Sequence, residues 1–98
     1  MTVFAVEYSY SPTSPTIAEI RPQHRSFLAK LKEQGILIGS GPYTDGKGGA
    51  LIIIQLADGA DLNQARELLD HDPFFTSGAL EKRHFHTWNP VLNIFGSA

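Results

Sequence analysis

The alternation of apolar and polar side chains divides this 98-residue chain into strand-like and helix-like segments. Residues 2–10 alternate and are rich in β-branched and aromatic side chains, which predicts a strand. Residues 36–43 and 50–56 predict two more strands, and the glycine-rich residues 44–49 between them predict a hairpin turn. Residues 80–92 predict a long final strand.

A helical spacing replaces this alternation after the first strand. The inward positions recur every three or four residues and are Ile17, Ile20, His24, Phe27, Leu28 and Leu31. Thr16 and Glu19 have the spacing of a capping box. Pro22 either kinks this helix or is the first-turn proline of a helix that starts near Arg21. Gly35 follows as its C-terminal cap.

A second helix is predicted over residues 62–69, with Asp61 as its N-cap. Pro73 ends the helical segment, and residues 74–78 are expected to form a loop. The resulting order, β-α-β-β-α-β, is the ferredoxin-like arrangement of the α+β class, a sandwich of four antiparallel strands with both helices on one face. The length suits one domain over residues 1–98.

The third predicted strand is apolar on both of its faces. Residues 51–54 read Leu-Ile-Ile-Ile without alternation, although a sheet with helices on one side should expose its other side to water. The same face of a second subunit would cover these side chains. The sequence therefore predicts a homodimer.

Composition excludes several classes of function. The net charge is −2 and no basic patch is visible, so nucleic-acid binding is not expected. The chain has no cysteine, which rules out disulfides, thiolate catalysis and zinc–thiolate sites. No apolar run approaches the length of a membrane helix and no signal peptide is recognised, so we expect a cytoplasmic protein without membrane contact.

His24 is the strongest candidate for chemistry because it lies on the apolar face of a helix. An inward imidazole without a hydrogen-bond partner costs about 1–3 kcal/mol. Asp72 is the natural partner: it would fix the tautomer and leave the other ring nitrogen free to act as an acid or base. Two structural interpretations remain open, in which His24 is a core residue with a satisfied hydrogen bond and Asp72 caps a turn through backbone amides.

The other polar motifs are weaker. His84 and His86 lie two apart on the last predicted strand and can chelate a metal, but no third ligand is visible. The alternative is a strand face that lines a pocket or dimer seam, with Trp88 as its apolar part. The glycine-rich segments match neither a phosphate loop nor a dinucleotide motif, so neither a metal nor an organic cofactor is expected.

Three segments together resemble the YciI-like family, also called the YCII-related domain: residues 21–28 (RPQHRSFL), residues 35–42 (GILIGSGP) and Asp72-Pro73-Phe74. The resemblance implies a dimeric α+β barrel whose cleft holds a His–Asp pair, which maps onto His24 and Asp72 as catalytic residues. The candidate ligand-binding residues are Arg21, Ser40, Gly41, Pro42, Phe74 and Phe75. The small side chains of residues 39–42 let another group approach the backbone, and the two phenylalanines would supply an apolar wall. One branch of the family is implicated in removing chloride from a chlorinated hydroxyquinol.

Two functions of different classes follow. The first is a cofactor-independent lyase or isomerase that uses His24 and Asp72 on a small aromatic or enol-containing metabolite, since proton transfer alone suffices for such chemistry. The second is a ligand-binding or accessory dimer without catalysis.

Overall fold

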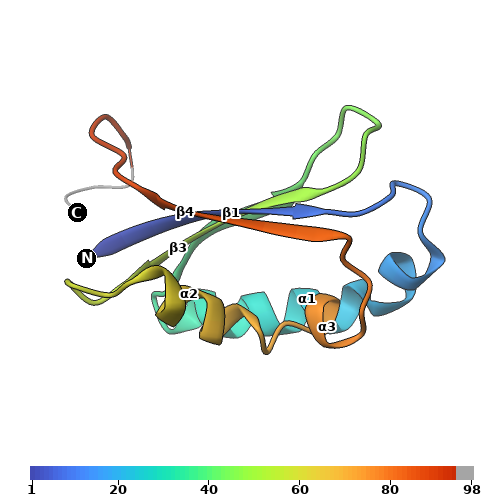
Figure 1. Cartoon of the computed structure of the whole chain (residues 1–98), viewed down its shortest axis with the longest axis horizontal. Coiled ribbons are helices and arrows are strands. Elements are labelled where there is room, and N and C mark those ends of the chain that lie inside the picture. Colours follow the sequence, from blue (N-terminus) through green and yellow to red (C-terminus); the bar gives the residue numbers. More distant parts are fainter. Residues whose placement is uncertain (95–98) are drawn as a thin grey trace.

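The computed structural model describes residues 1–94 and has the α+β architecture that the sequence predicts. Its elements are β1 (Thr2–Ser9), α1 (Pro15–Glu33), β2 (Leu37–Pro42), β3 (Ala50–Leu56), α2 (Leu62–Leu69), α3 (Pro73–Thr76) and β4 (Lys82–Trp88). The four strands form one antiparallel sheet in the order β2-β3-β1-β4. All three helices lie on the same face of this sheet (Figure 1), so the ferredoxin-like order is confirmed.

Helix α1 begins earlier than the capping-box pattern suggested. Its N-cap is Ser14, whose hydroxyl accepts a hydrogen bond from the backbone N–H of Ile17 at 3.2 Å. The prediction of Thr16 as the cap is therefore wrong, as is the alternative start near Arg21, because the helix runs through Pro22. The extra turn is stabilised by Ser14 and by Ile17, which is only 2% exposed.

The C-terminus of α1 forms a Schellman motif, as the glycine predicted. Gly35 has a φ of +74°, in the left-handed region that glycine adopts without strain. The N–H of Gly35 donates to the carbonyl of Lys32 at 3.0 Å, and that of Ile36 donates to the carbonyl of Leu31 at 2.9 Å. This cap turns the chain directly into β2.

The segment after α2 differs from the sequence-based expectation in two ways. Residues 74–78 were expected to form a loop, but Pro73–Thr76 form the one-turn helix α3, capped by Asp72. A single turn is too short to show periodicity, so only the Asp-Pro pair at its start signals it. The final strand is also shorter than residues 80–92 and ends at Trp88, before Pro90, which cannot donate a hydrogen bond in a sheet.

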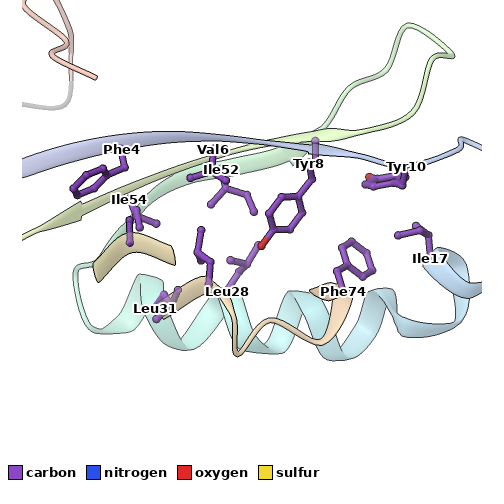
Figure 2. Packing of buried hydrophobic residues seen from close by; sticks show 13 residues of the cluster. Phe4, Val6, Tyr8, Tyr10, Ile17, Leu28, Leu31, Ile52, Ile54 and Phe74 are labelled. Carbon is purple, nitrogen blue, oxygen red and sulfur yellow. The ribbon is translucent and has the colours of Figure 1, made fainter. Parts of the chain in front are cut away.

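The hydrophobic core fills the space between the sheet and the helices (Figure 2). Alternate residues of β1 and β3 supply its upper layer, and Ile17, Leu28 and Leu31 of α1 supply much of the lower layer. Phe4, Val6, Ile52 and Ile54 are all 0% exposed. These contacts pack α1 against the centre of the sheet.

The opposite face of the sheet is partly apolar at its centre. Leu51 and Ile53 point away from the helices and are half-buried, as the unbroken apolar run of β3 predicted. His84 and His86 of β4 lie on this same face, where they pair in register with Glu7 and Ala5 of β1. Within residues 1–94, no helix is both long enough and apolar enough to cross a membrane.

Candidate active site

His24 and Asp72 form a buried hydrogen-bonded pair. The Nδ1 atom of His24 lies 2.8 Å from Oδ1 and 2.9 Å from Oδ2 of Asp72. The His24 residue is 7% exposed and Asp72 is 0% exposed. The two residues that the sequence suggested as partners, 48 positions apart, are thus in direct contact.

Asp72 also caps α3. Its Oδ1 accepts a hydrogen bond from the backbone N–H of Phe74 at 3.0 Å, and Pro73 occupies the first helical turn. Pairing with His24 and capping of a turn were alternatives at the level of sequence, yet one carboxylate does both. The rigid turn after Asp72 therefore fixes the position of the carboxylate beneath α1.

Tyr8 is the third member of the site, and sequence reasoning missed it. Its hydroxyl donates a hydrogen bond of 2.8 Å to Oδ2 of Asp72. Figure 2 shows this hydroxyl pointing from the sheet toward the helical layer. Burial and the nearby negative charge of Asp72 raise the pKa of Tyr8 well above its usual range, an effect that the Arg83 guanidinium partly opposes. The only sequence signal was the inward position of Tyr8 in the alternation of β1.

The donors around Asp72 settle which ring nitrogen of His24 is available. The carboxylate accepts from Tyr8, from the Phe74 backbone and from His24, which is the environment of an ionised group. Since an ionised carboxylate has no hydrogen to donate, Nδ1 of His24 carries the proton. Nε2 then holds the lone pair, and it makes no hydrogen bond within the part of the chain that the structure describes. In this tautomer the lone pair of Nε2 is available to accept a hydrogen bond or a proton.

Aromatic contacts hold the imidazole in place. The ring of Phe74 stacks on that of His24, with centroids 3.8 Å apart and an interplanar angle of 8°. Tyr10 in turn packs edge-on against Phe74 at 5.8 Å. One face of the imidazole is therefore covered, and its in-plane orientation is set by Asp72.

A cleft of about 270 Å³ opens beside His24, between α1 and the β2–β3 side of the sheet. Its lining includes five of the residues that were assigned to ligand binding from the sequence, namely Arg21, Ser40, Gly41, Pro42 and Phe74. It also includes Tyr10, Arg25 and Leu28, which the sequence analysis did not assign to ligand binding. Arg25 and Leu28 share a helical face with Arg21 and His24, and this spacing is the pattern from which their place in the cleft could have been predicted.

Phe75 does not line this cleft. It is 41% exposed, and the guanidinium carbon of Arg83 lies 3.6 Å from the centre of its ring. Adjacent residues of a helix point about 100° apart, so Phe74 and Phe75 cannot both face His24. Arg83 also forms an ion pair of 2.6 Å with Asp70, on the side of the core away from the cleft lining.

The described residues do not assemble an evident metal centre. Across residues 1–94, no group of three or more histidine, cysteine, aspartate or glutamate side chains is placed to hold a metal ion. His84 and His86 accordingly have no third side-chain ligand of these types within that range. Their contribution in this fold is to the free face of the sheet.

The family model for the YCII-related domain matches residues 1–89, which is most of the chain. The chain belongs to this family. No curated protein shows a significant sequence match to this YCII-related domain.

A solved structure of similar fold is that of 5-chloro-2-hydroxyhydroquinone dehydrochlorinase (TftG) from Burkholderia phenoliruptrix AC1100, in complex with 2,5-dihydroxybenzoquinone. The TM-score is 0.72 over 89% of the YCII-related chain and 93% of the dehydrochlorinase, at 20% sequence identity. At this identity the likeness establishes a common fold.

Proposed function

We propose that this protein is a small-molecule enzyme in which His24 transfers a proton. Asp72 orients the imidazole and stabilises its protonated form. One observation carries the proposal: Nδ1 of His24 is held 2.8 Å from a buried carboxylate, while Nε2 has no partner within residues 1–94 and its ring lines a cleft. A histidine fixed in this way is a suitable general acid or base.

The chemistry that such a site can perform alone is limited to proton transfer and its consequences. When Nε2 takes a proton from one atom of an enol or phenol and returns it to another, the result is isomerisation. When the proton stays on the imidazole while an anionic group leaves the ligand, the result is elimination. The cleft is largely apolar along Leu28, Ile52 and Phe74, which suits a small unsaturated or aromatic ligand.

The structural neighbour supplies the first substrate to test. The dehydrochlorinase acts, by its name, on 5-chloro-2-hydroxyhydroquinone, and its structure contains 2,5-dihydroxybenzoquinone. We propose that the YCII-related chain accepts a hydroxylated ring or enol of similar size. Loss of HCl from such a chlorinated ring can be measured by the chloride that is released and by the absorbance of the quinone product.

The test is a thermal-shift screen of phenols, hydroxyquinones and cyclic enols, followed by turnover assays on those that bind. His24→Gln should abolish turnover while leaving the fold intact. His71→Gln is the matched control, because His71 is exposed, neighbours Asp72 in sequence and does not line the cleft. Turnover that survives in His24→Gln at the wild-type rate would contradict the assignment of His24 as the acid or base.

We also propose that the protein is a homodimer joined through the free face of its sheet, as in a dimeric α+β barrel. Leu51 and Ile53 support this, because they place apolar side chains at the centre of a face that the described helices leave uncovered. Light scattering should then give twice the 10.8 kDa chain mass. Ile53→Lys should shift the mass toward one chain, whereas a wild-type mass of one chain at all concentrations would refute the dimer.

A ligand-binding module without catalysis is the second candidate. The observation that favours it is the structural work of Asp72, which joins α1, α3 and β1 through His24, Phe74 and Tyr8. A bound phenol or enol that exchanges no carbon-bound hydrogen with deuterium oxide, and undergoes no turnover, would favour this function over the first.

A further inference from the structure

Two arginines flank His24 on the wall of the cleft that α1 supplies. Arg21 and Arg25 lie three positions before and one position after His24, and all three residues line the cleft. Arg21 and Arg25 are four residues apart, so they project from the same side of the helix at successive turns. The opening beside Nε2 is therefore bordered by two permanent positive charges.

Neither of these guanidinium groups has a partner in the part of the chain that the structure describes. No hydrogen bond, ion pair or aromatic contact joins Arg21 or Arg25 to another side chain of residues 1–94. By contrast, Arg83 pairs with Asp70 and Arg66 lies over the ring of Phe85. Within the same range no aspartate or glutamate lines the cleft. This local positive charge stands out in a chain whose net charge is −2.

The remaining walls carry no charge. Leu28, Ile52 and Phe74 provide apolar surface, and Ser40 and Gly41 of β2 form the opposite side. A methyl group built on Gly41 would meet no atom within 4 Å, so this wall leaves room for a ligand. The cleft thus combines an apolar surface, one unpaired imidazole nitrogen and two unpaired guanidinium groups.

We infer that the ligand of this cleft is a small organic anion, a carboxylate or an enolate, whose negatively charged oxygens pair with Arg21 and Arg25. Guanidinium groups match such oxygens in a paired, fork-like geometry. The unsaturated part of the anion lies on the apolar surface with an exchangeable hydrogen near Nε2. The inference rests on the proposed function for the role of His24, and it adds the charge of the ligand. The two arginines also stabilise the additional negative charge that forms when His24 removes a proton.

Binding of matched acid and amide pairs tests the inference without any turnover. The probes are benzoate with benzamide, 4-hydroxybenzoate with 4-hydroxybenzamide, and pyruvate with pyruvamide, followed by nuclear magnetic resonance titration. At least one acid should bind about tenfold or more tightly than its amide. Its affinity should fall as salt rises from about 50 to about 500 mM, while that of the amide should not. If no acid in the panel binds more tightly than its amide, the inference is overturned.

Variants assign the effect to the two arginines. Arg21→Gln and Arg25→Gln should each weaken binding of that acid by about 5- to 30-fold and leave the amide unchanged. Lys30→Gln is the control, because Lys30 is exposed, belongs to α1 and does not line the cleft. Equal affinity in the Arg and Lys variants would overturn the assignment.

The same experiment separates this inference from the proposed function. His24→Gln should retain the preference for acid over amide but lose turnover. Turnover of neutral phenols with no preference for anions would refute the anionic ligand and leave the role of His24 standing. Anion binding with no turnover of any ligand in the screen would support the anionic ligand and refute the proposed role of His24.

Discussion

Replacement of Tyr8 with phenylalanine should destabilise the fold by about 1.5–3 kcal/mol, the usual contribution of a hydrogen bond to a charged acceptor. The hydroxyl of Tyr8 donates to Oδ2 of Asp72 at 2.8 Å, and both side chains are almost completely buried. Water therefore has no access to replace the missing donor. The phenyl ring keeps its packing against the core, so the loss is confined to one oxygen atom.

The remaining donors set the upper limit of this effect. After the substitution Asp72 still accepts from His24 and from the backbone N–H of Phe74. The carboxylate then has one hydrogen-bond donor fewer but is still paired. Its loss of stabilisation should stay below the roughly 3–5 kcal/mol that follows when a buried charge loses its only partner.

Urea denaturation, followed by the fluorescence of Trp88, measures the difference in unfolding free energy. For a domain of this size, the melting temperature should fall by roughly 4–8 °C for each kcal/mol. Tyr10→Phe is the matched control, because Tyr10 is 6% exposed and its hydroxyl makes no hydrogen bond within residues 1–94. If both variants lose the same stability to within about 0.5 kcal/mol, the buried hydrogen bond to Asp72 contributes nothing and the reasoning fails.

Three further outcomes are expected. Burial and the charge of Asp72 raise the pKa of Tyr8 above its ordinary value of about 10, so above that pH the unfolded state releases a proton that the folded state keeps. The free energy of unfolding should therefore be unaffected below about pH 10 and fall as pH rises above it, with a smaller slope in Tyr8→Phe when urea denaturation is repeated at each pH. Gly48→Ala should cost about 2–4 kcal/mol in thermal unfolding, because φ is +78° and a Cβ would collide with the backbone of Tyr10, whereas Gly46→Ala, in open space, should cost about 1 kcal/mol. Elemental analysis of untagged protein should find no stoichiometric metal, and zinc or nickel lost on His86→Ala would disprove this.

The parts of the fold that follow local rules were predictable. The apolar spacing of α1 located its buried face, including His24, and Gly35 marked its end. The unbroken apolar run of β3 signalled a face of the sheet that the described helices leave uncovered. Such patterns are visible because they repeat along the chain or require a special backbone conformation.

The errors arose where two local solutions were nearly equal or where the pattern was too short. Ser14 and Thr16 are both good caps, and the helix begins after Ser14, with Pro15 in its first turn and Ile17 buried. Residues 73–76 make one turn, which has no period to read. Phe74 lines the cleft and Phe75 does not, because helical geometry directs adjacent side chains about 100° apart.

Tyr8 shows the limit of sequence reasoning about the site. In an alternating strand it reads as a core residue, and nothing nearby indicates that its hydroxyl has a charged partner. The partner comes from the turn before α3, which packs against α1. Contacts of this kind are determined by the tertiary structure and leave no local signature.

The long separations within the hydrogen-bonded group have a consequence for folding. Tyr8 and His24 lie 64 and 48 positions from Asp72, so the group closes two large loops at once. Closure of such loops has an entropic cost that is recovered only when β1, α1 and α3 dock together. During synthesis, the histidine leaves the ribosome well before its carboxylate partner. An N-terminal fragment that ends at β3 would contain four of the seven elements and no oriented imidazole, so site formation should coincide with completion of the fold.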